Sequence, residues 1–244
     1  MKIADGVEAL ELTVNLMGRQ TTIYPTLFWD EESVILVDAG FPGLEQQIEE
    51  AIEKAGVSFI KLNTVILTHQ DIDHVGSLPV ILAKSQHEIE VLAHEVEKPY
   101  IQGDKPLLKA NPERIAKMFK ALPEEQRKRM EAVFLNPPKA KVDRIIEDRE
   151  ELPYCGGIIV IHTPGHTTGH ICLYHKPSKT LVTGDALTAE NGQLSGPNPA
   201  ATYDMGEANK SVKKIAQYEI ENVVCYHGGV FQGNAQQQIA RLAE

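Results

Sequence analysis

The stretch Thr68-His69-Gln70-Asp71-Ile72-Asp73-His74 decides the fold of this 244-residue chain. It follows an apolar run at residues 64–67 and precedes a helix-like segment at residues 75–83. Imidazoles and carboxylates at the exit of a strand can converge on metal ions, because a loop frees side chains from strict alternation between two faces. The stretch therefore predicts a metal site at the end of a buried strand.

Three further segments place histidine or aspartate at expected strand ends or turns. They are Thr-Pro-Gly-His-Thr-Thr-Gly-His at 163–170, Thr-Gly-Asp-Ala at 183–186 and Cys-Tyr-His-Gly-Gly at 225–229. Neutral imidazoles suit zinc and other borderline ions, and a carboxylate can bridge two cations. Together the four segments supply the complete ligand set expected of a two-metal hydrolytic site: His69, Asp71, Asp73, His74, His166, Asp185 and His227.

The order and spacing of these segments, and the glycines beside them, resemble the metallo-β-lactamase-fold hydrolases over essentially the whole chain. That family has an αββα sandwich and a His-x-His-x-Asp-His signature. The resemblance implies one metal held by His69, the residue at position 71 and His166. It implies a second metal held by Asp73, His74 and His227, with Asp185 bridging the two.

The resemblance also implies the roles of groups around the metals. A hydroxide between the two ions would be the nucleophile, and Asp73 would be the catalytic residue that orients it and passes a proton to the leaving group. Asp38 matches a family position that supports a ligand histidine, although it is also interpretable as a turn aspartate that bonds backbone amides. His170 is expected to stabilise the turn at 167–169 and not to bind metal.

Asp71 departs from the family pattern, so the signature here is HxDxDH in place of HxHxDH. With two divalent ions and a bridging hydroxide, the extra carboxylate would make the metal core formally neutral. We expect this variant to favour manganese or iron, which prefer oxygen ligands, alongside or instead of zinc. The alternative is that Asp71 turns away and one metal position is vacant or weak.

Alternating strands and helices predict an α/β fold, and the resemblance specifies a four-layer αββα sandwich in a single domain over residues 1–244. Strands are expected at 7–17, 21–29, 33–37, 64–67, 90–93, 158–162, 171–175, 180–183 and 222–226, and helices at 44–55, 205–218 and 234–243. Residues 95–150 form a helical insertion, with helices at 111–122 and 123–135. It is either a solvated surface excursion or a lid whose apolar side chains shape the substrate pocket: Met118, Phe119, Met130 and Phe134.

Composition limits the partners. A net charge of −10 argues against nucleic acid and anionic membranes, which both require basic patches. The sequence shows no apolar run of about 20 residues and no secretory signal at its start, so a cytoplasmic location is expected. The three cysteines lie in or beside apolar stretches, as reduced core thiols do. A homo-oligomer is compatible with the sequence, which carries no signal for it.

The function expected is that of a binuclear metal-dependent hydrolase acting on a small ester, lactone, thioester or amide. Lactonases that open acyl-homoserine lactones are similar in length and ligand spacing, but they often have a tyrosine where this chain has Thr188. Tyr203 or Tyr226 could serve instead. The alternatives are a di-iron redox protein of the same fold, a phosphodiesterase and a non-catalytic binding module.

Overall fold

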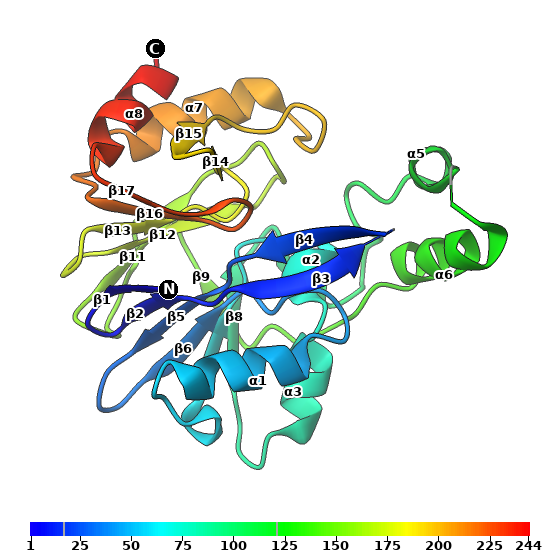
Figure 1. Ribbon diagram of the computed structural model, residues 1–244, viewed down its shortest axis with the longest axis horizontal. Coiled ribbons are helices and arrows are strands. Elements are labelled where there is room, and N and C mark those ends of the chain that lie inside the picture. Colours follow the sequence, from blue (N-terminus) through cyan, green and yellow to red (C-terminus); the bar gives the residue numbers. More distant parts are fainter. Residues whose placement is uncertain (17, 121) are drawn as a thin grey trace.

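Two β-sheets lie face to face between two layers of helices in the computed structural model, which describes residues 1–16, 18–120 and 122–244 (Figure 1). The first sheet contains, in spatial order, β1 (Lys2–Ala4), β2 (Val7–Ala9), β5 (Thr26–Trp29), β6 (Val34–Val37), β7 (Thr64–Ile66), β8 (Glu90–His94) and β9 (Arg144–Ile146). The second contains β10 (Glu151–Leu152), β11 (Ile158–His162), β12 (Ile171–His175), β13 (Thr180–Val182), β16 (Asn222–Cys225) and β17 (Gly229–Gln232). This arrangement confirms the αββα sandwich.

The apolar strand β6 shows why the layers form. All four of its residues are buried, because one face of the strand meets helices and the other meets the second sheet. Leu36 belongs to the cluster under the helices, and Ile35 and Val37 belong to the cluster between the sheets. A strand covered on both faces reads as a continuous apolar run and not as an alternating one.

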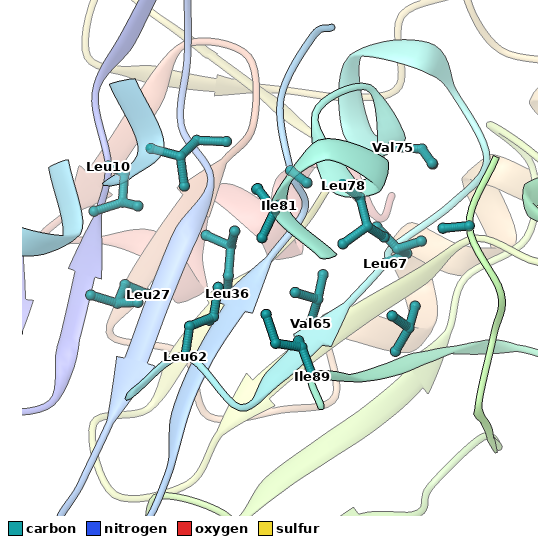
Figure 2. Close-up of a cluster of buried hydrophobic side chains, with 14 of the residues drawn as sticks. Leu10, Leu27, Leu36, Leu62, Val65, Leu67, Val75, Leu78, Ile81 and Ile89 are labelled. Atoms are coloured by element: carbon teal, nitrogen blue, oxygen red, sulfur yellow. The ribbon is translucent and has the colours of Figure 1, made fainter. Parts of the chain in front are cut away.

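Each outer layer contains a pair of longer helices. On the first sheet, α1 (Glu45–Lys54) and α3 (Leu78–Lys84) bury one apolar stripe each, and Figure 2 shows Leu78 and Ile81 of α3 above Leu36 and Val65 of the strands. On the second sheet, α7 (Met205–Ile215) and α8 (Ala235–Leu242) do the same. Shorter elements are η1 (Phe59–Lys61) and α2 (Ile72–Val75).

The N-terminal strands differ from the sequence prediction. The segments expected as strands at 7–17 and 21–29 are each divided between two partners, and Met17 lies outside the described residues. Their outer parts, β3 (Leu12–Leu16) and β4 (Arg19–Ile23), form a separate antiparallel ribbon. Pro25 lies at the second break, where its missing N–H cannot continue the ladder. A hairpin of β14 (Thr188–Glu190) and β15 (Gln193–Ser195) was not predicted, although its turn is Asn191-Gly192.

The insertion contains α4 (Lys98–Ile101), α5 (Pro112–Phe119) and α6 (Glu124–Leu135), and α5 and α6 project from the sandwich near the tip of the β3–β4 ribbon (Figure 1). Both helices expected in the insertion are present, the first of them shorter than predicted. The assignment of the whole chain to a single domain stays a prediction. Within the described part of the chain, none of the helices is both long and apolar enough to cross a bilayer.

Candidate metal centre

The motif at residues 68–74 lies at the carboxyl end of β7. Because β6, β7 and β8 are parallel, their carboxyl ends lie at the same edge of the first sheet, where ligands bind in open α/β sheets. His69 and Asp71 lie in the loop after the strand, and Asp73 and His74 lie within α2. Because α2 begins directly after Asp71, side chains from the loop and from the first turn of the helix lie close together.

The second sheet supplies the distal residues from three loops. His166 follows β11, Asp185 follows β13, and His227 lies between β16 and β17. Gly184, beside Asp185, has a φ of 48°, and a Cβ there would lie 2.7 Å from Nε2 of His170. The loop that presents Asp185 therefore requires glycine at position 184.

The seven side chains form two groups, in each of which the ligand atoms lie within 4.8 Å of one another. In the first group, Nε2 of His166 lies 3.1 Å from Oδ2 of Asp71 and 3.2 Å from Oδ2 of Asp185. Nε2 of His69 lies 3.4 Å from Oδ2 of Asp71. Asp71 thus points into the centre, which disagrees with the alternative that it turns away.

The second group is Asp73, His74 and His227. Nε2 of His227 lies 3.2 Å from Oδ2 of Asp73, and Nε2 of His74 lies 3.8 Å from the same oxygen. Asp185 reaches this group with its other oxygen, Oδ1, which lies 3.4 Å from Nε2 of both histidines. One carboxylate oxygen therefore faces each group, as the predicted bridging role requires.

The donor atoms fit divalent cations. Among the described residues, buried Nε2 of His69, Nε2 of His74 and Oδ1 of Asp185 have no hydrogen-bond partner. Unsatisfied buried polar atoms are costly and usually have a partner or an ion. Nε2 of His69 faces the first group, whereas Nε2 of His74 and Oδ1 of Asp185 lie 3.4 Å apart in the second, where a cation is the group they would hold. The structure brings all seven predicted residues together, and their binding of metal stays a prediction.

Asp38 contacts a candidate ligand histidine and also bonds a backbone amide, so both of the roles considered for it apply. Its Oδ2 lies 2.8 Å from Nδ1 of His74, and its Oδ1 accepts a hydrogen bond of 2.8 Å from the Thr68 amide. A carboxylate on Nδ1 directs the other imidazole nitrogen toward the metal position. His170 bonds Thr163 across the loop that contains the turn at 167–169, with its carbonyl accepting from the Thr163 amide at 2.8 Å. Its Nε2 also accepts from the Asp185 amide at 3.1 Å, a contact that was not expected.

The pKa values of His227 and His69 are shifted in opposite directions by their surroundings. Burial would lower the pKa of His227, but the Asp185 and Asp73 carboxylates outweigh it and raise the pKa to about 10. Burial and the nearby His74 lower the pKa of His69 to about 4. In the metal-free protein His227 is therefore protonated near neutral pH and His69 is not. Ion binding to the second group has to release the His227 proton.

Three residues at the centre were not found from the sequence. Lys109, from the insertion, donates through Nζ to Oδ2 of Asp71 and lies 2.8 Å from Nε2 of His166. Glu97, fully buried, accepts from the amide and side chain of Gln70 through one oxygen. Gln70 stands inside the motif, which is a signal for it, whereas Lys109 and Glu97 lie in charged segments that show nothing at the sequence level.

The two tyrosines considered for a lactonase role are placed differently. The Tyr226 hydroxyl donates to the backbone carbonyl of Asp73, and its ring stacks on His74 at a centroid distance of 3.8 Å. Tyr203 is 56% exposed. Within the described part of the chain neither residue lines the cavity beside the centre. Tyr226 therefore holds His74 and the backbone of Asp73 in place.

Comparison with known proteins gives the family. A family model described as the metallo-beta-lactamase superfamily matches residues 19–227. The probable metallo-hydrolase YflN of Bacillus subtilis (strain 168) is 29% identical over 231 residues, covering 88% of this chain and 83% of that protein. The hydroxyacylglutathione hydrolase GloC of Haemophilus influenzae is 26% identical over 170 residues, covering 66% of this chain and 65% of that protein.

A solved structure agrees at the level of the fold. The metallo-beta-lactamase family protein TTHA1429 from Thermus thermophilus has a TM-score of 0.72 at 23% identity, covering 99% of this chain and 79% of that chain. The matched family model includes every residue of both ligand groups, from His69 to His227. The chain belongs to the metallo-beta-lactamase superfamily, in a variant with aspartate at the second signature position.

Proposed function

We propose that this protein is a metal-dependent hydrolase that cleaves a small ester, lactone, thioester or amide with an apolar acyl group. Members of its superfamily are generally hydrolytic enzymes, and one relative is named a hydroxyacylglutathione hydrolase. The observation that carries the proposal is an apolar cavity that opens directly onto the ligand groups.

This cavity has a volume of about 430 Å³. Asn15, Asp71, Asp73 and Lys109 provide its polar lining. Its apolar walls come from the β3–β4 ribbon, the turn after β6, α2, the insertion and the loop after β15: Val14, Leu16, Phe41, Pro42, Ile72, Leu107, Ala110, Met130, Val133, Phe134 and Ala201. A largely apolar pocket with a few convergent polar groups is typical of a small-molecule site.

The insertion is therefore proposed as part of the pocket, in line with the lid interpretation. Met130 and Phe134 of α6 line the cavity, and Phe119 of α5 is buried against Phe134 at a ring distance of 5.3 Å. The side chain of Met118, included in the same expectation, lies outside the described residues. An apolar acyl chain would lie against α6 with its carbonyl end toward the carboxylates.

Metal ions and Asp73 would supply different parts of the proposed reaction. Divalent ions at the centre would polarise the carbonyl and lower the pKa of water, as they do in hydrolytic metal sites. Asp73 lines the cavity, and burial would raise its pKa, but His74 and His227 outweigh burial and lower it. As an ionised carboxylate at the cavity floor, Asp73 would accept the proton of the attacking water and return it to the leaving group.

Several finer expectations stay predictions. Two divalent ions with a nucleophile between them, zinc as the metal, and manganese or iron because of Asp71 are all to be tested by metal analysis. A small-molecule partner, the exclusion of nucleic acid and membrane, and a cytoplasmic location also stay predictions. The redox and phosphodiesterase alternatives have no specific support in the geometry, since the apolar cavity walls suit an acyl group better than a phosphodiester.

The test is hydrolysis by metal-loaded protein across esters, lactones, thioesters, β-lactams and phosphodiesters, with short to long acyl chains. We expect acyl substrates to be cleaved. Phe134→Ala, which enlarges the cavity, should shift the preference toward longer chains by about tenfold in relative kcat/KM. Leu135→Ala is the matched control, because Leu135 is 59% exposed and does not line the cavity. Activity on phosphodiesters alone, or none on any acyl substrate, would refute the proposal.

A further inference from the structure

Lys109 places a positive charge inside the first ligand group. It lies in the segment between α4 and α5, and its side chain is 13% exposed. Nζ donates to Oδ2 of Asp71, lies 2.8 Å from Nε2 of His166 and donates to the Ala201 carbonyl at 3.3 Å. An ammonium has three N–H donors and no acceptor, so these contacts use all of them. Lys109 therefore has no donor left for a substrate.

The segment that carries Lys109 is held by the metal motif itself. The Leu108 amide donates a hydrogen bond of 2.6 Å to Oε1 of Gln70. Nε2 of Gln70 donates to Glu97 at 2.8 Å, and this fixes the orientation of the amide group. The residue before Asp71 thus anchors the residue before Lys109. The Gln70–Leu108 and Asp71–Lys109 hydrogen bonds therefore join the two segments side by side and hold the ammonium in the centre.

The atoms that Lys109 contacts are the same atoms that a metal ion would use. A lone pair on Nε2 of His166 can accept from the ammonium or bind a metal, but not both. The inward oxygen of Asp71 has two lone pairs, but a metal ion bound there would lie beside the ammonium that already donates to it, and the two positive charges would repel each other. A metal ion in the first group would therefore have to displace Lys109 from His166 and would be repelled by it at Asp71.

We propose that the Lys109 ammonium takes the place of one of the two cations, so that the protein holds a single divalent ion at Asp73, His74, His227 and Asp185. This inference rests on the proposed metal dependence, and it changes the expected number of ions. One divalent ion and one ammonium balance the three carboxylates of Asp71, Asp73 and Asp185. A second divalent ion added beside the ammonium would leave an excess of buried positive charge, which is costly.

The pairing also explains why position 71 is aspartate. A histidine there would offer the ammonium one lone pair and no compensating charge. A carboxylate forms a charge-assisted bond with it, which is about twice as strong as a neutral one. Asp71 and Lys109 thus form a pair that replaces histidine and metal.

The experiment counts ions and does not depend on activity. Metal-depleted protein is equilibrated with Zn²⁺, separated from free ion and analysed by elemental mass spectrometry. We expect about one ion per chain in the wild type and about two in Lys109→Met, which frees Asp71 and His166. Lys105→Met is the matched control, because Lys105 lies exposed in the same segment, and it should keep about one ion. Two ions in the wild type, or one in a folded Lys109→Met, would overturn the proposal.

A second measurement uses the wild type alone, in case Lys109→Met does not fold. Anomalous scattering from zinc-loaded crystals should show one peak, beside Asp73, His74 and His227, and a second peak beside Asp71 and His166 would overturn the proposal. The outcome is separable from that of the hydrolysis panel. Two ions with ester cleavage would refute only the lysine inference, whereas one ion without cleavage of any acyl substrate would refute only the proposed function.

Discussion

Asp38 binds His74 and the start of the metal motif at the same time. Its Oδ2 accepts from the Thr68 hydroxyl at 2.8 Å as well as facing His74, and its Oδ1 accepts from the Thr68 amide. The backbone at Asp38 has a φ of 64°, a left-handed conformation that asparagine also adopts readily. A change to asparagine therefore tests the carboxylate and leaves the backbone in place.

Asp38→Asn is expected to weaken metal binding by about 10–100-fold, because an amide N–H₂ would face a donor and His74 would lose its orientation. Competition with a coloured chelator measures the affinity. Asp30→Asn is the control, since Asp30 caps a turn after β5 through the Glu32 and Ser33 amides. Equal affinities in the two variants would show that Asp38 does not orient the ligand.

The sequence predicted those features of the centre that depend on residues close together in the chain. Four of the seven candidate ligands stand within six consecutive residues, and Asp71 was recognised as unusual from its position alone. The partner that explains Asp71 was not predictable, because Lys109 is 38 residues away in the chain and reaches the centre only through the folding of the insertion. Its neighbours in the sequence resemble an ordinary solvated segment.

Among the elements, strands with a full apolar pattern were predicted best. The bounds of β11 and β12 match the prediction, because β12 is wholly buried, β11 is buried at three of its five residues, and both strands are followed by turns. The prediction of single strands at 7–17 and 21–29 was wrong, because β-forming residues continue across the point where the chain leaves the main sheet. That departure depends on which strand lies alongside, and the sequence of a single segment does not contain it.

Glu97 is the group that joins the loops of the two sheets. Its Oε2 accepts from Gln70, and its Oε1 accepts from the Thr167 hydroxyl at 2.7 Å and the Gly169 amide at 2.8 Å. Burial raises its pKa, although these donors oppose the shift. All of the partners are donors, so a carboxylate satisfies them and an amide does not.

Glu97→Gln is expected to destabilise the fold by about 1–3 kcal/mol, because the new N–H₂ would face buried donors that lose their acceptor. Urea unfolding measures the change in the free energy of unfolding. Glu95→Gln is the matched control, since Glu95 is exposed two residues away, and it should change stability little. If Glu97→Gln is as stable as that control, Glu97 does not hold the loops together.

For the whole molecule, the centre is a junction between the two halves of the sandwich. One sheet supplies His69, Asp71, Asp73 and His74, and the other supplies His166, Asp185 and His227. The pocket beside it is assembled from the ribbon, the turn after β6, the metal motif, the insertion and the loop after β15, which is why sequence spacing predicted the candidate ligands and not the cavity. An ion at the centre would bind both halves and so stabilise the folded state as a whole.

Metal removal is therefore expected to lower the melting temperature. At an ion concentration about a hundredfold above Kd, binding contributes about 2.7 kcal/mol. For a chain of this length about 1 kcal/mol shifts Tm by about 2–4 °C, so chelation should lower Tm by about 5–10 °C. His227→Ala should lose most of this chelator effect, because it removes a ligand from the second group. His87→Ala should keep it in full, because His87 is exposed and belongs to neither ligand group. A wild type whose Tm does not respond to the chelator, or equal responses in the two variants, would contradict a stabilising ion at the junction of the two sheets.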